Sequence, residues 1–331
     1  MPTSDMRRAM ATAPLGDDVF GDDPMVNRLE EMAAERLGKE AAVFVASGTM
    51  GNLVGVAVNA RTGEELIADA DSHVFQYESA GAAVVAGVQI RPVVTEGGVM
   101  SPEQIAEVIR PRDDPHQPIS AAITFEDTHN RHGGVVWPLE SLRAAFESAH
   151  AHRLRVHLDG ARMFNAAVAL GVGVADIAAC SDTVTFCLSK GLACPAGSVF
   201  CGPREAVDDA RRWRKRLGGG MRQAGVLAAC GVIALDQMVD RLAEDHANAR
   251  TLAEGLSEMP GVTCDLTRVQ TNLVYFDLGG IDAAPFTAEC KKRGLLSEGT
   301  GPKRMRFVTH YGIDAQDIQA ALKICEEVLT A

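Results

Sequence analysis

Short apolar runs alternate with longer amphipathic stretches along most of this 331-residue chain. The stretches at 25–37 and 139–151 carry apolar residues at helical spacing, which predicts amphipathic helices. The runs that predict strands, because they are short and rich in β-branched or aliphatic residues, are 41–46, 66–68, 89–94, 121–125, 154–158, 183–187 and 199–201. This alternation predicts an α/β fold with a mostly parallel, doubly wound, seven-stranded sheet flanked by helices.

The last third of the chain follows a different pattern. A long helical stretch at 223–258 contains a break near 236–240, and its second half is polar. The elements predicted beyond it are strands at 272–276 and 305–309 and helices at 285–293 and 313–329. We therefore expect a large domain over residues 1–240 and a smaller α+β domain over residues 241–331.

Composition and charge exclude several classes of partner. A net charge of −12 and a pI near 5.2 argue against nucleic acid or an anionic membrane as the main partner. The sequence shows no signal-like start and no apolar run of membrane-spanning length, which predicts a cytoplasmic protein. The eight cysteines include no C-x-x-C pair, so we expect reduced core thiols and no metal. The aspartates between 16 and 24 lack EF-hand spacing and predict a solvated acidic loop.

A lysine and a carboxylate each follow an apolar run closely. Lys190 comes just after the run at 183–187, and Asp159 comes directly after the run at 154–158. Desolvation lowers the pKa of a lysine, and a neutral amine can form a Schiff base with a carbonyl. A carboxylate can keep a ring nitrogen protonated by ion pairing. The plainer alternatives are a lysine that reaches into water and an aspartate that caps the next helix.

Four more polar or small residues follow strands in the same way. Gly48 and Thr49 begin a helix directly after a strand, where backbone N–H groups and the helix dipole favour a phosphate. No G-x-G-x-x-G or P-loop motif is present, which disfavours a dinucleotide or a nucleoside triphosphate. His73 and His129 each lie just past a strand, although either could be a surface or capping histidine. Ligands of open α/β sheets bind outside the carboxyl ends of the strands, so these groups predict one shared site.

Taken together, these segments resemble the L-threonine aldolases, which are pyridoxal-phosphate enzymes of fold type I. The segments that carry the resemblance are 16–24 (GDDVFGDDP), 47–52 (SGTMGN), 70–73 (ADSH), 126–130 (EDTHN), 157–162 (HLDGAR), 188–191 (LSKG), 218–225 (GGGMRQAG) and 306–310 (RFVTH). The resemblance covers almost the whole chain. It implies a lyase that cleaves L-threonine and L-allo-threonine to glycine and acetaldehyde, tolerates other β-hydroxy-α-amino acids, and assembles as a homotetramer made of two dimers.

The resemblance also implies roles for individual residues. Lys190 would hold pyridoxal 5'-phosphate as a covalent aldimine. The residues implied to bind the cofactor are Gly48, Thr49, His73, Asp159, Arg162, Lys190, Lys215 and Arg222. The residues implied to bind the substrate are Arg162, Arg306, Tyr77 and His129. Arg162 and Arg306 would grip the substrate carboxylate, as planar guanidinium groups favour. The catalytic candidates are Lys190, His73 and His129, and the base that takes the β-hydroxyl proton is one of the two histidines or a water that they position.

Two points stay open at this stage. Family members usually begin with a segment like Asp-Leu-Arg-Ser-Asp-Thr-Val-Thr before the equivalent of Pro2, so the resemblance predicts a truncated start and weakened activity or assembly here. The alternatives to an aldolase are another type I lyase or transaminase acting on a small amino acid with the same cofactor, or a pyridoxal-phosphate binder that is inactive because the first segment is missing.

Overall fold

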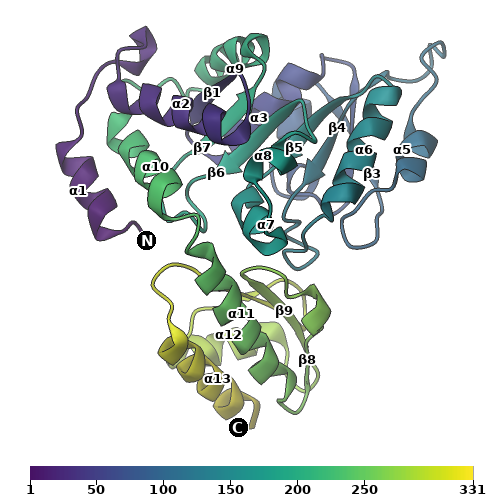
Figure 1. Ribbon diagram of the computed structural model, residues 1–331. Coiled ribbons are helices and arrows are strands. Elements are labelled where there is room, and N and C mark those ends of the chain that lie inside the picture. The colour runs from purple at the N-terminus through teal and green to yellow at the C-terminus, as the bar shows by residue number, and fades with distance from the viewer. Residues whose placement is uncertain (331) are drawn as a thin grey trace.

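One large sheet organises residues 1–202 of the chain. In the computed structural model, which describes residues 1–330, seven strands pair in the order β1-β7-β6-β5-β4-β2-β3 (Figure 1). They are β1 (Ala41–Val45), β2 (Glu65–Asp69), β3 (Gln89–Val93), β4 (Ser120–Glu126), β5 (Arg155–Asp159), β6 (Thr183–Cys187) and β7 (Ser198–Gly202). Strands β3, β2, β4, β5 and β6 are parallel, and β7 is antiparallel to both β6 and β1, so β1 runs in the same direction as β6. The predicted mostly parallel seven-stranded sheet is confirmed.

Helices cover both faces of this sheet. They are α1 (Ser4–Thr12), α2 (Pro24–Leu37), α3 (Gly48–Asn59), α4 (His73–Gln76), α5 (Pro102–Val108), α6 (Leu139–Ala151), α7 (Met163–Leu170), α8 (Val174–Ala178), α9 (Arg204–Arg216) and α10 (Gly225–Gln237), with a 3-10 turn at Asp18–Phe20 and a π-helical turn at Ala82–Ala86. Successive strand residues point to opposite faces. Phe44 therefore packs into the core that contains α2, α6 and α10, whereas its neighbours Val43 and Val45 pack against α3 and α9.

A second, antiparallel sheet follows α10. Its strands are β8 (Val262–Thr263), β9 (Leu273–Leu278), β10 (Glu298–Gly299) and β11 (Arg304–Val308), paired in the order β10-β11-β9-β8. Helices α11 (Leu242–Ser257), α12 (Ala283–Lys292) and α13 (Ala315–Thr330) pack with this sheet around a separate apolar cluster, below the large sheet in Figure 1. The break predicted in the long helical stretch falls between α10 and α11. No helix in the described part of the chain is both long and apolar enough to cross a membrane.

The acidic loop before α2 is only partly solvated: Asp22 is exposed, but Asp18 and Asp23 are buried, so the prediction is wrong for these two acids. The carboxylate of Asp23 is buried, where it accepts hydrogen bonds from the N–H groups of Met25 and Val26 at the start of α2 and of Gly225 at the start of α10. Asp18 is also buried and forms an ion pair of 2.9 Å with Arg214 of α9. These acids stabilise helix starts and a buried arginine, and two of their partners, Gly225 and Arg214, lie about 200 residues away in the sequence.

Close packing of α3 on the sheet depends on glycine. A Cβ atom at Gly51 would lie 2.3 Å from Cγ2 of Thr185 in β6, and one at Gly55 would lie 2.4 Å from the ring of His157 in β5. Both contacts are far shorter than real Cβ contacts, so only glycine lets the helix approach this closely. The approach places the first residue of α3, Gly48, beside the end of β6, where a Cβ would lie 2.7 Å from Sγ of Cys187.

We expect Gly51→Ala to lower the free energy of unfolding by about 1–3 kcal/mol, the usual cost of overpacking a well-packed core. Urea unfolding followed by circular dichroism measures the change. Gly280→Ala is the matched control, because a Cβ there meets no atom within 4 Å. Equal stabilities of the two variants would contradict the close-packing argument.

Candidate functional site

The predicted site residues gather at one edge of the large sheet. The strands that precede them, β1, β2, β4, β5 and β6, run in one direction, so their carboxyl ends meet at that edge. The residues that follow these ends are Gly48, Thr49, His73, His129, Asp159 and Lys190. The prediction that one sheet edge carries them all is confirmed by the strand directions.

Asp159 and His73 are connected by two buried polar side chains. Nδ2 of Asn52 lies 2.7 Å from Oδ2 of Asp159 and 2.8 Å from Oε1 of Glu78, and Nδ1 of His73 lies 2.9 Å from the same Glu78 oxygen. Imidazole and carboxylate atoms of His73, Glu78 and Asp159 all lie within 4.8 Å of one another. Oδ1 of Asn52 and Oε2 of Glu78 are buried and have no hydrogen-bond partner within residues 1–330. These two oxygens are therefore free to accept hydrogen bonds from a ligand.

Lys190 opens into a small cavity of about 230 Å³. Arg162, which precedes α7, lines the same cavity, so the lysine and one candidate carboxylate-binding arginine face a common space. Burial lowers the pKa of Arg162, and the positive charge of Arg306 lowers it further. The two guanidinium groups therefore lie near enough to repel each other, and an anion bound between them would relieve that repulsion.

Arg306, the second arginine of this pair, lines a larger cavity of about 550 Å³. Its lining includes His73, Tyr77, Asn130 and Arg306. Nη1 of Arg306 lies 3.1 Å from Oδ1 of Asn130, and Nη2 forms an ion pair with Glu298 of β10. The predicted substrate residues Tyr77 and Arg306 therefore face the same cavity as His73.

His129 is placed differently from the other candidates. Its side chain is fully buried, and it does not line either cavity described above. Nε2 lies 3.1 Å from Oδ1 of Asp69, whose other oxygen accepts a hydrogen bond of 2.6 Å from Thr95. Burial lowers the pKa of His129, but the carboxylates of Glu126 and Asp69 raise it by more, so the net shift is upward. In this structure His129 contacts Asp69 behind the cavity wall.

Two clusters of histidine and acidic side chains could hold a cation, although the sequence predicts no metal. One is the His73, Glu78 and Asp159 group, and the other contains Asp69, His129 and His132. Both are explained without an ion, because in each a carboxylate oxygen already accepts a hydrogen bond from an imidazole.

The candidate phosphate-binding residues belong to the glycine-rich turn after α9 and its flanks and to the start of α3. Ser47 caps this helix by accepting a hydrogen bond from the N–H of Met50. The glycine-rich turn after α9 packs directly beside it, since a Cβ at Gly219 would lie 2.4 Å from Sδ of Met50. Lys215 and Arg222 flank this turn, and Arg222 forms an ion pair of 2.8 Å with Asp17. The glycine-rich turn thus lies beside the helix start, whereas the side chain of Arg222 is directed to Asp17.

Sequence reasoning did not single out Asn52, Glu78, Asn130 or Glu298. Asn52 lies one helical turn after Gly48, inside the segment SGTMGN, and Glu78 lies five residues after His73. Both residues are therefore close in sequence to predicted site residues, and this closeness is the sequence feature that could have indicated them. Glu298 offers no such signal, because it reaches Arg306 through the pairing of β10 with β11.

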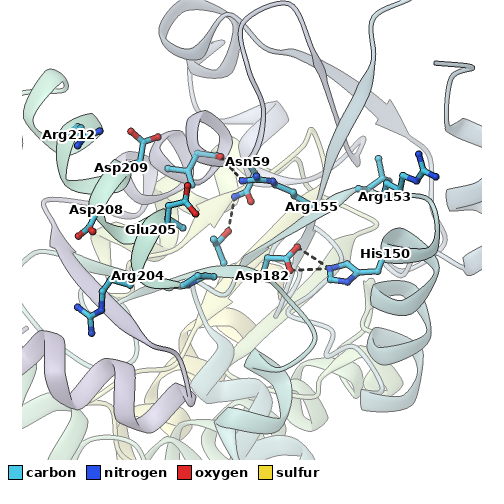
Figure 2. A pocket seen from close by; sticks show the side chains of 15 residues that line it. Asn59, His150, Arg153, Arg155, Asp182, Arg204, Glu205, Asp208, Asp209 and Arg212 are labelled. Carbon is cyan, nitrogen blue, oxygen red and sulfur yellow. Dashed lines mark hydrogen bonds and ion pairs between the residues drawn. The ribbon is translucent and has the colours of Figure 1, made fainter. Parts of the chain in front are cut away.

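A cavity bigger than the two described above lies away from the sheet edge that carries the candidate residues. It measures about 950 Å³ and is lined by the amino ends of β5 and β6, the end of α3 and the first turns of α9 (Figure 2). Figure 2 shows the imidazole of His150 beside the carboxylate of Asp182, and Nε2 of His150 lies 3.0 Å from Oδ1 of Asp182. Parallel sheets bind ligands at the carboxyl ends of their strands, so cavity size does not identify the site here.

Comparison with known proteins agrees with this geometry. A family model described as β-eliminating lyase matches residues 1–278. Low-specificity L-threonine aldolase 1 of Arabidopsis thaliana is 40% identical over 336 residues, which cover 99% of this chain and 93% of the relative. Low specificity L-threonine aldolase of Escherichia coli (strain K12) is 41% identical over 318 residues, covering 96% and 93%. A solved structure of Leishmania major threonine aldolase superimposes with a TM-score of 0.86 at 19% identity, covering 99% of this chain and 96% of that one.

The fold is thus the type I fold of pyridoxal-phosphate enzymes, and the family match makes the chain a lyase. The chain belongs to the β-eliminating lyase family and, within it, is related to the low-specificity L-threonine aldolases. The predicted family resemblance, fold class and enzyme class are confirmed.

One carboxyl group beside the site should titrate unusually. Asp127 follows β4 and is fully buried, and burial raises its pKa to about 8 from an ordinary value of 3.8. The folded protein therefore keeps a proton that the unfolded chain loses between those two values. Because the folded state binds this proton more tightly than the unfolded state, the contribution of Asp127 to stability is present below about pH 4 and is lost as the pH rises to about 8.

We expect Asp127→Asn to remove this loss, because an amide mimics the protonated carboxyl group. The variant should match the wild type near pH 4 and be more stable at pH 8 by at least about 1 kcal/mol, since one pKa unit corresponds to roughly 1.4 kcal/mol. Urea unfolding at the two pH values measures it. Asp71→Asn, at a half-exposed carboxylate, is the control. A constant difference between Asp127→Asn and wild type at both pH values would contradict the assignment.

Proposed function

We propose that this protein cleaves L-threonine and L-allo-threonine to glycine and acetaldehyde with pyridoxal phosphate, and accepts other β-hydroxy-α-amino acids. The observation that carries the proposal is the convergence of a lysine, a buried aspartate, a histidine and a helix start on one sheet edge. The curated relatives named above carry the same activity in their names.

The residues present fit this cofactor. Lys190 would provide the amine that attaches its aldehyde, and Asp159 would accept a hydrogen bond from its protonated ring nitrogen. Gly48 and Thr49 offer helix-start N–H groups to its phosphate, with Lys215 and Arg222 adding positive charge. The unpartnered buried atoms beside Asp159 support a polar ring at this position. When bound, the cofactor stores the electron pair left on Cα as the Cα–Cβ bond breaks.

The chain's own residues orient the substrate and move its proton. Arg162 and Arg306 hold the carboxylate between them. His73 would stack on the cofactor ring, and it is the one of the two candidate histidines that lines the cavity, so we assign removal of the β-hydroxyl proton to His73 or to a water that it positions. His129 is buried and does not line the cavity, so we assign it no direct contact with the reacting atoms. Tyr77 lines the cavity and would border the substrate side chain.

We further propose the division of labour between the two halves of the chain. Residues 1–240 bind the cofactor, and residues 241–331 form the smaller domain that supplies Arg306; Ala331 lies outside the described residues. Separate apolar clusters in the two halves support this boundary, although Leu242 packs with the first. The active assembly is a homotetramer, a dimer of dimers.

We expect the purified chain to form glycine and acetaldehyde from both threonine diastereomers and to show the visible absorption band of a lysine-bound cofactor. Lys190→Ala should lose the band and at least about 10³-fold of turnover, because no other lysine among the described residues lines the cavity of Lys190. Lys303→Ala, at a half-exposed lysine of the second sheet, is the matched control and should keep both. An unchanged band in Lys190→Ala, or a loaded enzyme that yields neither product, would overturn the proposal.

We expect Glu298→Gln to lower KM for L-threonine by up to about fivefold and leave kcat unchanged. Glu298 holds the guanidinium that we assign to the substrate carboxylate, so the substrate must displace it. Partly exposed ion pairs are worth roughly 0–1 kcal/mol, which sets the size of the effect. Steady-state kinetics measure it, with Glu289→Gln, in an exposed ion pair of α12, as control. A higher KM would show that Glu298 helps the arginine instead.

A further inference from the structure

The ring of His73 is held through one nitrogen by a buried carboxylate. Nδ1 lies 2.9 Å from Oε1 of Glu78, whose side chain is 0% exposed, whereas that of His73 is 31% exposed. An ionised carboxylate can only accept a hydrogen bond, so Nδ1 must carry the hydrogen. In the neutral ring the lone pair is then on Nε2, which is the nitrogen needed for taking a proton from a substrate.

Glu78 is itself held in place by Asn52. The side-chain amide of Asn52 has two hydrogens, and it donates to Oε1 of Glu78 and to Oδ2 of Asp159. One amide thus donates to two buried carboxylates from different parts of the chain. Because the side chain of Asn52 is also buried, neither bond competes with water, and the geometry of all four groups is mutually determined.

We propose that Glu78 is a positioning residue for the proton transfer: it holds His73 in the Nδ1–H form with Nε2 free, and Asn52 fixes this pair to Asp159. The inference rests on the proposed function only for the reaction that the proton transfer serves. These hydrogen bonds fix the position of His73 relative to Asp159, the residue proposed to bind the cofactor ring.

The charges around His73 set the sign of its response. The groups that face it are Glu78, Asp159 at the end of β5, and Glu126 at the end of β4, whose Oε2 accepts the backbone N–H of His73 at 2.6 Å. The hydrogen bond to Glu78 is the largest influence and raises the pKa of His73, while burial opposes it. Burial also raises the pKa of Glu78. Removing the charge of Glu78 therefore favours the neutral imidazole at lower pH.

The test compares Glu78→Gln with wild type by NMR of the full chain carrying ¹⁵N-labelled histidine, with and without pyridoxal phosphate. A glutamine keeps an oxygen for Nδ1–H and Asn52 but loses the charge. We expect the titration midpoint of His73, assigned through its loss in His73→Gln, to shift to lower pH. In the loaded enzyme the rising limb of kcat/KM should shift in the same direction, with kcat falling more than KM changes.

Asp71→Asn is the matched control, because Asp71 lines the same cavity without a hydrogen bond or ion pair to His73 in the described chain. It should leave the His73 midpoint unchanged. A purely structural role for Glu78 would lower thermal stability without moving that midpoint, and this result would overturn the inference. If Glu78→Gln fails to fold, the wild-type ¹⁵N shifts decide: a hydrogen on Nδ1 supports the inference, and one on Nε2 overturns it.

The two proposals fail separately. A protein that shows no cofactor band and no products removes the aldolase proposal, but the His73 titration of the cofactor-free chain still tests the role of Glu78. A loaded, active enzyme whose His73 midpoint is the same in wild type and Glu78→Gln keeps the aldolase proposal and removes this one.

Discussion

The shared direction of five strands is the constraint on which the site depends. Strands β1, β2, β4, β5 and β6 end at one edge of the sheet, so residues from five separate parts of the sequence meet there. The close approach of α3, which Gly51 and Gly55 permit, brings the helix start and Asn52 to the same edge. A single shift in strand direction or helix packing would separate the lysine, the aspartate and the histidine, whatever their identities.

Much of this arrangement follows from local sequence pattern. Strands in this chain are short and apolar, and a polar group or a glycine follows the end of five of them, so strand directions alone predict the convergence of Lys190, Asp159 and His73. The family motifs add the roles. Pattern did not reveal the partners of buried charges, because a carboxylate such as Asp23 looks like any loop aspartate until α10 packs against it. Its partner is 202 residues away.

The same reason explains the other differences from expectation. His129 sits in a family-like segment, yet its imidazole is directed to Asp69, a contact set by how the loops after β2 and β4 pack. Glu298 reaches Arg306 only because β10 pairs with β11. In each case a buried charged group needs a polar partner because burial removes it from water. Which partner it meets depends on tertiary packing, so spacing and periodicity in the sequence do not predict it.

The arginine pair shows how the two sheets depend on each other. Arg162 follows β5 of the large sheet, and Arg306 belongs to β11 of the small one, so a substrate carboxylate bound by both joins the two sheets. Without a substrate, repulsion between the guanidinium groups opposes that closeness, and Glu298 neutralises one of them from the small sheet's own side. The carboxylate of Glu298 therefore offsets part of the electrostatic repulsion between the two arginines. In the binding mode proposed above, the substrate carboxylate would replace Glu298 as the partner of Arg306, so recognition of the carboxylate would be coupled to the placement of the small sheet.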